Sequence, residues 1–509
     1  MTPTASPIMV QGTASSSGKS LIAAALCRIL RQDGYRVAPF KAQNMSNNSF
    51  VTDDGLEMGR AQVVQAYAAG LRPDVRMNPV LIKPSSDTGA QVVLRGRPAF
   101  IMDAAQWHET RETLRGVVRE CYESLAAEYD ILVLEGAGSP AEINLKQNDI
   151  VNMGMAAMAD SPVLIVGDID RGGVFASLVG TMQLFDKEER TRVKGFVINK
   201  FRGDVGLLKP GLDQLEELTG VPVLGVVPWI THRIDDEDGV SQWFTQTRRS
   251  DDAEVDICII RLPHISNFTD FIPFQAVPGV GVRWCDRADT LGNPDLLLIP
   301  GTKATIADLR VLKQAGIAEA IGSYVRHGGT VFGVCGGFQM LGRAIRDPAH
   351  SESAVEEEAG LGLLDMTTTF GPTKTTVQTR ATVIGTSSWL LDDIDGATVE
   401  GYEIHMGQSE LGDTVRTVTA SRDERARTHV SGVADTTGRV LGTYLHGVFD
   451  SGSVVSGIVN AIRKRKGLPP IDGVTSDRHS ELEEELDRLA GTVRAALDMA
   501  TIRGLCGVG

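Results

Sequence analysis

The sequence predicts an α/β protein with two domains, a doubly wound phosphate-loop domain followed by a second α/β domain. Short apolar runs alternate with segments of helical periodicity through both halves, a pattern typical of parallel sheets covered by helices. A glycine-rich turn joins an apolar run to a helical segment once in each half, at Gly12–Ser20 and at Gly333–Gly337. The length of 509 residues also exceeds what one typical core holds.

The composition indicates which binding partners and which cellular compartment to expect. The formal net charge is −15, which argues against nucleic acid or an anionic membrane as a general partner. The 6 cysteines form no C-x-x-C pair, as expected in a reducing compartment. The sequence has no secretory signal pattern and no apolar run long enough for a membrane span, so we expect a cytoplasmic protein.

The first glycine-rich turn has the character of a phosphate loop. It follows the apolar run Ile8–Val10, and its small residues let backbone N–H groups close around phosphate oxygens at a helix N-terminus. Lys19 is expected to hold the terminal phosphates and Ser20 to hold Mg²⁺. Thr13 stands where the common motif has its first glycine. The predicted ATP contacts are Gly12, Thr13, Ser17, Gly18, Lys19, Ser20 and, at the end of a later strand, Asn199.

Two acidic positions are candidates for the metal. Glu135 ends the apolar strand Ile131–Leu134 and precedes glycines, the arrangement that places a carboxylate beside a phosphate loop to hold Mg²⁺. Asp54 lies in a second acidic segment, which could hold Mg²⁺ or cap the helix that follows it.

Polar segments follow several of the strands, at the sheet edge where open α/β sheets bind ligands. The three segments are Lys41–Ser49, a loop at Lys83–Gly89, and Gly167–Gly173. The first could also be an Asx-rich turn and the third a structural loop with internal ion pairs. The candidate substrate residues are Lys41, Asn44, Asn47, Lys83, Asp168, Asp170 and Arg171, with Arg95 and Arg202 as further basic contacts.

Charge and periodicity divide the chain. A highly charged stretch without hydrophobic periodicity separates the two α/β patterns, and helical spacing dominates after Asp450. We therefore expect a phosphate-loop domain at 1–232, a charged linker at 233–253, a second α/β domain at 254–450 and a helical C-terminal extension at 451–509.

The turn Gly333–Gly337 carries Cys335 at its centre. A turn of this kind lifts the central side chain out of the sheet, and the N-terminus of the following helix favours a thiolate, so Cys335 is a candidate nucleophile. His446 and His405 are the candidate bases, and we favour His446 because a histidine at a later strand end recurs in such sites. The N–H groups of Gly336 and Gly301 are candidates for an oxyanion site.

Four segments resemble the cobyric acid synthase family, the glutamine-dependent amidoligases of cobalamin biosynthesis. These segments are Phe40–Ser49, Gly167–Ala176, Val334–Leu341 and Gly401–His405. The resemblance extends from Val10 to about Asp450; the first half is similar to the dethiobiotin synthetase group and the second resembles class I glutamine amidotransferases. Those amidotransferases usually have a glutamate two residues after the histidine, where this chain has Val448, a departure shared by the cobyric acid branch. Asp450 is one possible residue to orient His446.

The resemblance implies an enzyme that uses ATP and Mg²⁺ and takes ammonia from L-glutamine. The implied acceptor is a corrinoid polycarboxylate, adenosylcobyrinic acid a,c-diamide, amidated at its b, d, e and g carboxylates, with a sheltered path for ammonia between two sites. Two alternatives stay open: a cobyrinic acid a,c-diamide synthase, and a regulatory phosphate-loop ATPase with an inactive amidotransferase module. The oligomeric state is not predicted.

Overall fold

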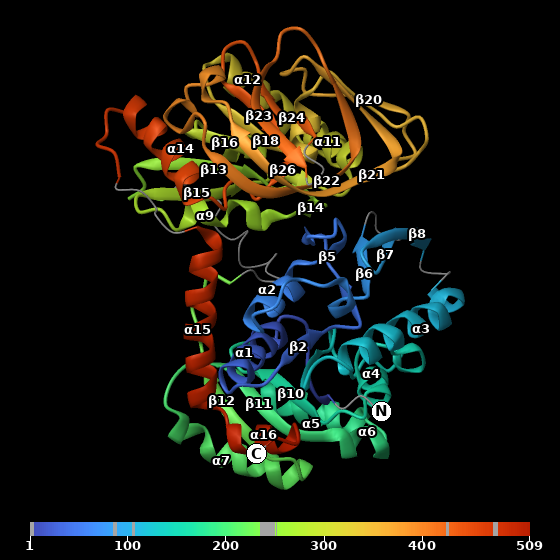
Figure 1. Ribbon diagram of the computed structural model, residues 1–509. Coiled ribbons are helices and arrows are strands. Elements are labelled where there is room, and N and C mark those ends of the chain that lie inside the picture. The colour runs from blue at the N-terminus through green and yellow to red at the C-terminus, as the bar shows by residue number, and fades with distance from the viewer. Residues whose placement is uncertain are drawn as a thin grey trace.

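A computed structural model describes residues 5–84, 89–103, 107–234, 250, 252–423, 427–471 and 477–508. Two lobes lie one above the other, each built on its own sheet, and Figure 1 shows the long helix α15 (Arg478–Ala496) running between them. The charged linker predicted at 233–253 lies largely outside the described residues. No helix among the described residues is long and apolar enough to cross a membrane.

The lower lobe is built on a sheet whose six described strands run in the order β12-β11-β10-β1-β9-β2, with every neighbouring pair parallel. Its strands are β1 (Ser6–Gly12), β2 (Val37–Phe40), β9 (Ile131–Glu135), β10 (Val163–Asp168), β11 (Val193–Phe201) and β12 (Val223–Pro228). The strand β1 lies at the centre, so the phosphate loop that follows it opens at the middle of the ligand edge.

Helices cover both faces of this sheet and complete the predicted doubly wound arrangement. They are α1 (Lys19–Gln32), α2 (Arg60–Ala68), α3 (Trp107–Ala126), α4 (Met153–Met158), α5 (Val174–Leu184), α6 (Lys187–Arg192) and α7 (Val205–Thr219). Alanine-rich α1 is buried on all sides from Ile22 to Leu30, between strands β1 and β9 and the helices α2 and α15. Its small side chains let the helix approach the sheet closely.

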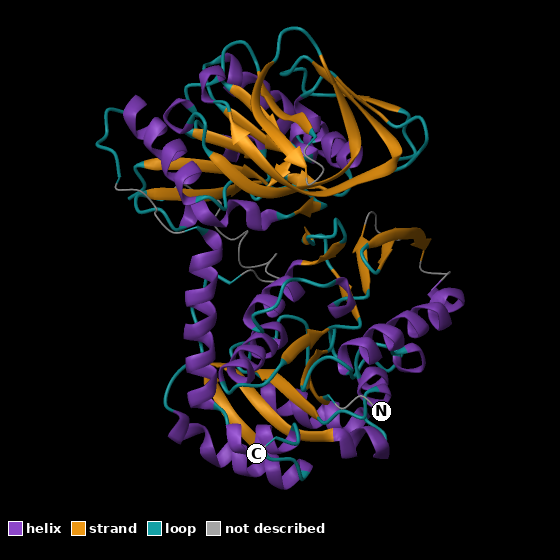
Figure 2. Cartoon of the chain, in the orientation of Figure 1, coloured by secondary structure: helices purple, strands orange, loops and turns teal. Residues whose placement is uncertain are grey.

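Two small sheets rise from the lower lobe toward the upper one, as Figure 2 shows. One contains β3 (Gln43–Met45), β6 (Val80–Pro84), β7 (Gly89–Leu94) and β8 (Arg97–Asp103), and the other pairs β4 (Ser49–Val51) with β5 (Glu57–Gly59). The prediction of a loop at Lys83–Gly89 was wrong at both ends, because Lys83 pairs with Gln91 within a β-hairpin. Residues 85–88 lie outside the described residues.

The upper lobe has a mixed sheet. Its parallel part contains β13 (Val255–Ile260), β15 (Val280–Cys285), β16 (Leu296–Ile299), β18 (Val331–Val334) and β25 (Val440–Thr443). Long antiparallel strands continue it, namely β21 (Met366–Val383), β22 (Thr398–Leu411), β23 (Arg416–Asp423) and β24 (Thr428–Ala434). The short strand β26 (Leu445–His446) pairs with β22. The main helices are α11 (Thr305–Gln314), α12 (Ile317–Arg326), α13 (Gly336–Leu341) and α14 (Gly452–Arg465).

The C-terminal helices return to the lower lobe. Leu486 of α15 is fully buried in one cluster with Ile22 and Leu26 of α1, and Arg28 of α1 forms an ion pair with Asp487 at 2.7 Å. After α15, Leu497 bridges to Gly225 of β12, and α16 (Met499–Leu505) ends the described helices. The helical extension predicted at 451–509 is thus divided: α14 packs on the upper lobe, whereas α15, as its leucine spacing predicts, and α16 pack on the domain that lies first in the sequence.

Candidate active sites

The predicted phosphate loop is packed so closely at Gly12 and Gly18 that no side chain would fit at either position. A Cβ atom on Gly12 would lie 2.1 Å from Ser17 Oγ, and one on Gly18, whose φ is +97°, would lie 2.0 Å from Asn199 Nδ2. Asn199 Nδ2 donates to the carbonyl of Ser17 at 2.9 Å, and Thr13 N–H donates to Val166 O at 3.1 Å. The predicted ATP residues therefore lie together, and the side chain of Asn199 supports the loop by binding the loop's backbone.

Lys19, Ser20 and Glu135 form the centre of this site. Lys19 Nζ donates to the carbonyls of Ala14 and Gly138 at 3.0 and 3.1 Å, which aims the ammonium across the loop. Ser20 Oγ donates to Glu135 Oε1 at 2.7 Å, so the two predicted metal ligands are adjacent. Lys41 Nζ lies 3.1 Å from the same Glu135 oxygen.

Asp54 does not join this group. It lies in the turn between β4 and β5 and lines a cavity against strand β21 of the upper lobe. Glu135 instead contacts Gln65, whose Nε2 donates to Oε2 at 2.5 Å and whose helical position gave no sequence signal. Among the described residues no group of three or more His, Cys, Asp and Glu side chains is arranged to hold a metal ion.

The loop after β10 is held by ion pairs. Asp168 accepts from Lys200 Nζ at 2.9 Å, and Lys200 also donates to the carbonyl of Ser16 in the phosphate loop at 2.6 Å. Arg171 lies 3.6 Å from Asp168, and Asp170 pairs with Arg202 at 3.2 Å on the surface. Asp168 thus braces the phosphate loop, whereas Arg171 and Asp170 remain accessible. Arg95 pairs with Glu120, apart from the residues of this loop.

The segment predicted to contact the substrate carries buried polar atoms that lack partners. Among the described residues, such side-chain oxygens include Gln43 Oε1, Asn47 Oδ1 and Asn48 Oδ1. Asn44, which is 2% exposed, donates to Gln62 Oε1 at 2.9 Å, while the Nε2 atom of Gln62 has no partner. Burying unpaired polar atoms costs free energy, about 1–3 kcal/mol each, so their concentration here favours a ligand site.

In the upper lobe, Cys335 occupies the strained turn that the sequence predicts. Its φ is +49°, in a region that side chains other than glycine rarely adopt, and it immediately precedes helix α13. A Cβ on Gly337 would lie 2.1 Å from the carbonyl of Ile299, so only glycine permits the close packing behind the turn. The thiol is 7% exposed, and its Sγ lies 3.7 Å from the carbonyl oxygen of Ile404.

His446 is held by Asp270, which the sequence analysis missed. His446 Nδ1 lies 2.7 Å from Asp270 Oδ2, and the N–H of Gly447 donates to Asp270 Oδ1 at 3.3 Å. Asp450, the orienting residue considered from sequence, instead lies 4.0 Å from Arg60. Asp270 comes from a 3₁₀ turn (Phe268–Phe271) 176 residues before the histidine, and nothing in the local sequence marks that pairing.

The environment of His446 favours its charged form. Burial lowers its pKa, but the charge of Asp270 and hydrogen bonds to Asp270 and Cys335 outweigh burial and raise the pKa to about 10. The arrangement therefore supports an imidazolium that lies between the Asp270 carboxylate and the sulfur of Cys335. The rival base His405 has other partners: its ring stacks on Tyr444 at 3.9 Å and its Nδ1 lies 2.7 Å from Gly407 O.

The two predicted oxyanion residues border this pair. A Cβ on Gly301 would lie 3.3 Å from His446 Cε1, and one on Gly336 would lie 2.9 Å from the backbone nitrogen of Thr302. The turn after β16 and the start of α13 thus approach each other beside Cys335 and His446.

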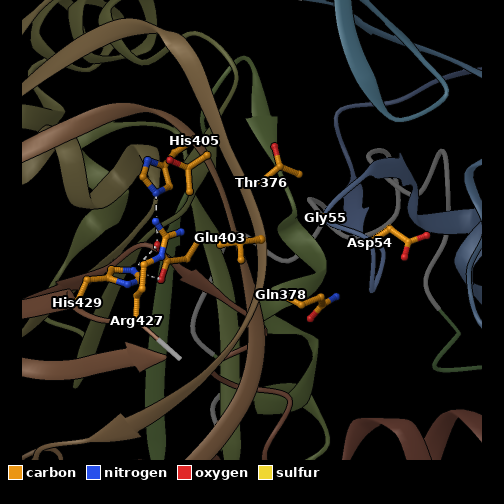
Figure 3. Close-up of a pocket in the computed structure, with 10 residues that line it drawn as sticks. Asp54, Gly55, Thr376, Gln378, Glu403, His405, Arg427 and His429 are labelled. Carbon is orange, nitrogen blue, oxygen red and sulfur yellow. Dashed lines mark hydrogen bonds and ion pairs between the residues drawn. The ribbon is translucent and has the colours of Figure 1, made fainter. Parts of the chain in front are cut away.

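A cavity of about 620 Å³ lies where the turn at Asp54 and Gly55 meets the strands of the upper lobe. Figure 3 shows Glu403 between His405 and His429, with Arg427 beside them. Glu403 accepts from His429 Nε2 at 2.9 Å, and although burial raises its pKa, the two histidines lower it to about 2. Neither Cys335 nor His446 is among the described residues that line this cavity.

A buried ion cluster lies between the lobes. Glu57 is 1% exposed and accepts from Lys83 of the lower lobe and Lys374 of the upper lobe, each at 2.5 Å. Burial raises the pKa of Glu57, but the two lysines hold it well below its usual range. Burial lowers the pKa of Lys83. Lys83, predicted as a substrate contact, is therefore also part of the contact between lobes.

The fold and the two sites define a class: a phosphate-loop nucleotide-binding domain joined to a glutamine amidotransferase domain, the architecture of a glutamine-dependent ligase. A family model described as the CobQ/CobB/MinD/ParA nucleotide binding domain matches residues 8–238, and one described as the CobB/CobQ-like glutamine amidotransferase domain matches residues 256–454. The chain belongs to the cobyric acid synthase family, which are amidotransferase-type ligases.

Curated relatives match over nearly the whole chain. Cobyric acid synthases of Caldanaerobacter subterraneus subsp. tengcongensis, Yersinia enterocolitica and Salmonella typhimurium are each 50% identical to it, over 97% of this chain and 97% of their own. These matches confirm the predicted family, fold class and enzyme class. They favour the first of the three interpretations that the sequence left open.

Proposed function

We propose that this protein converts adenosylcobyrinic acid a,c-diamide to adenosylcobyric acid by amidating its b, d, e and g carboxylates, using ATP and ammonia released from glutamine. The observation that carries the proposal is the position of the Cys335–His446–Asp270 group, whose neighbour Asn267 contacts the lower lobe. Asn267, beside His446, accepts a hydrogen bond from Ser49 of that lobe at 2.9 Å. Ammonia becomes unreactive ammonium in neutral water, so a donor site at the contact with the ligase domain suits this chemistry.

The Cys335 group supports glutamine hydrolysis. The Cys335 thiolate attacks the carboxamide carbon of glutamine, the C–N bond breaks, and His446 gives its proton to the departing ammonia. Water, deprotonated by His446, then cleaves the thioester to give glutamate and the free thiol. Asp270 keeps the proton of Nδ1 in place, so that Nε2 exchanges protons with the reacting atoms.

Opposite charges near Cys335 fit the amino-acid end of glutamine. Gln339 lies one helical turn after Cys335, and Thr305 Oγ1 lies 3.3 Å from both Gln339 Oε1 and Glu352 Oε2. Burial raises the pKa of Glu352 to about 7 and lowers that of nearby Lys303 to about 8, so each gains from an added partner of opposite charge. The α-amino and α-carboxylate groups of glutamine are such partners.

The lower lobe supports carboxylate activation. A substrate carboxylate oxygen attacks the γ-phosphoryl group of ATP and ADP leaves; ammonia then displaces phosphate from the acyl phosphate. Lys19 holds the phosphates, and the adjacent oxygens of Ser20 and Glu135 fit Mg²⁺, a cation that prefers such ligands. When bound, Mg²⁺ supplies charge neutralisation at the phosphate oxygens. Asp54 as a metal ligand has no support from its position.

The corrinoid is proposed to lie against the segment around Asn44 and Asn47, because unpartnered amide oxygens such as Asn47 Oδ1 can accept from amides of the ligand and Gln62 Nε2 can donate to its carboxylates. Lys41 and Lys83 provide buried positive charge there. Asp168 and Asp170 are less suited, because one braces the phosphate loop and the other pairs with Arg202.

Mass spectrometry of the corrinoid tests the proposal. With Mg·ATP and glutamine, we expect four successive carboxylate-to-amide mass shifts, and with Cys335→Ala the shifts should require added ammonia. ATP hydrolysis without any mass shift would refute the substrate assignment. Shifts with cobyrinic acid instead would favour the a,c-diamide synthase reaction.

A further inference from the structure

Ser49 of the lower lobe forms hydrogen bonds with two residues that flank His446, namely Asn267 and Tyr402. The backbone N–H of Ser49, in β4, donates to Asn267 Oδ1 at 2.9 Å, and the backbone carbonyl of Ser49 accepts from the hydroxyl of Tyr402 at 3.0 Å. Ser49 and Asn267 are 1% and 2% exposed, so water does not compete for these bonds. The strand β4 is thereby tied to the upper lobe at two points on the same residue.

Both of these neighbours touch the histidine ring. The ring of Tyr402 stacks on that of His446, with centroids 5.3 Å apart and an interplanar angle of 18°. The amide nitrogen of Asn267 lies 3.4 Å from His446 Nδ1, the atom that also faces Asp270. Asn267 is itself in the left-handed region, with φ +51°, a conformation that its surroundings must hold.

We propose that Tyr402 and Asn267 are positioning residues through which the docked strand β4 sets the orientation of His446, so that glutamine hydrolysis depends on the ligase domain being in place. Tyr402 fixes the plane of the imidazole and Asn267 limits its rotation about the Asp270 contact. A rotation of the ring would turn Nε2 away from Cys335 and break the relay of protons. The inference rests on the proposed glutaminase site.

The same serine connects this arrangement to the ligase side. Lys83 Nζ donates to Ser49 Oγ at 2.9 Å and also pairs with Glu57. Ser49 therefore lies between a residue proposed to meet the corrinoid and the two residues that flank His446. A shift of β4 at the ligase side has a continuous packed route to the glutaminase site.

Tyr402→Phe tests the proposal with little change in shape, because it removes the hydroxyl and keeps the ring on His446. Gln378→Ala is the matched control, because Gln378 Nε2 also donates across the lobes to β4, but at the carbonyl of Val51 rather than at Ser49. Glutamate release by the full chain should fall about tenfold in kcat for Tyr402→Phe, with KM for glutamine unchanged, and by less than about twofold for Gln378→Ala. Ammonia-dependent amidation should stay unchanged in both.

A second readout follows Cys335 itself and needs no corrinoid. The pH dependence of alkylation of Cys335 by iodoacetamide reports the thiolate that His446 maintains. We expect Asn267→Ala and Tyr402→Phe to shift this profile to higher pH and Gln378→Ala to leave it in place. Asn267→Ala also serves if Tyr402→Phe does not fold, which thermal denaturation will show.

Three outcomes overturn the inference. These are wild-type glutamate release in both Tyr402→Phe and Asn267→Ala, equal losses in Tyr402→Phe and Gln378→Ala, and an unshifted alkylation profile in folded variants. Absence of corrinoid amidation by the wild type would instead contradict the substrate assignment, because glutamate release and alkylation are measured without the corrinoid.

Discussion

The two sites differ in how complete they are without ligands. In the upper lobe, His446 interacts with both Cys335 and Asp270, and His446 is almost fully buried. In the lower lobe, the described residues of the substrate segment leave polar atoms such as Asn47 Oδ1 without partners. The difference indicates that the proposed glutaminase site is preorganised by the protein alone, whereas the proposed ligase site needs its substrates to satisfy its buried polar groups.

Lys19→Ala should have the broadest effect, because it impairs amide formation with every nitrogen donor, and it should separate the two sites. Loss of the ammonium that faces the phosphates should lower amidation on the order of 10²–10³-fold, with either glutamine or ammonia as donor. Glutamate release without corrinoid should be preserved, because Lys19 lies in the lower lobe, where its Nζ donates to the carbonyls of Ala14 and Gly138. Parallel assays of amide formation and glutamate release check this, and an equal loss of both would contradict the separation.

Asp270→Asn tests preorganisation in the upper lobe. An asparagine can donate to Nδ1 and leave the proton on Nε2, the wrong tautomer, so glutamate release should fall on the order of 10³–10⁴-fold. Ammonia-dependent amidation should remain.

In the same variant, we expect a change in the pH dependence of Cys335 alkylation. The wild-type pKa of about 10 keeps His446 charged throughout the neutral range, so its titration should cause no loss of glutaminase activity from pH 8 to pH 6. Without the Asp270 charge, the largest remaining influence on the pKa of His446 is burial, which lowers it. The Cys335 alkylation profile of Asp270→Asn should therefore lose the thiolate that a charged histidine maintains, and an unchanged profile would argue against the pair.

Leu486→Ala tests whether helix α15 unfolds together with the ligase domain and contributes to its stability. Leu486 is fully buried against α1, so its truncation should lower the free energy of unfolding by about 2–5 kcal/mol. Differential scanning calorimetry with and without Mg·ATP should show that the unfolding transition destabilised by the substitution is the one whose midpoint temperature Mg·ATP raises. Truncation of an exposed α15 residue such as Glu484 serves as the control.

Lys83→Met should have the smallest effect and sharpen the assignment of the corrinoid site. Removing a buried cation that meets a substrate carboxylate should raise KM for the corrinoid about tenfold. Lys374→Met is the control, since Lys374 also pairs with Glu57 but lies in the upper lobe. Equal increases in KM in both variants would mean that the effect comes from Glu57 rather than from the substrate.

Sequence patterns predicted most of the site residues but few of their partners. Gly12–Ser20, Glu135 and Asn199 meet as expected, because parallel strands bring their carboxyl ends to one edge. Asp54 does not meet them, because its turn extends toward the upper lobe. The antiparallel ribbon of β21 and β22 was also missed, since its long strands carry polar residues on exposed positions.

By itself, the sequence predicted the local motifs of both sites: a phosphate loop with Lys19 and Ser20, and a strained turn with the candidate nucleophile Cys335. Both are local motifs whose geometry follows from neighbouring residues. Only the tertiary structure decided what controls His446, because Asp270 lies 176 residues before it and the hydrogen bond between Tyr402 and Ser49 spans 353 residues. Such contacts depend on how whole domains pack, and packing of distant surfaces leaves no signal in the spacing of one sequence.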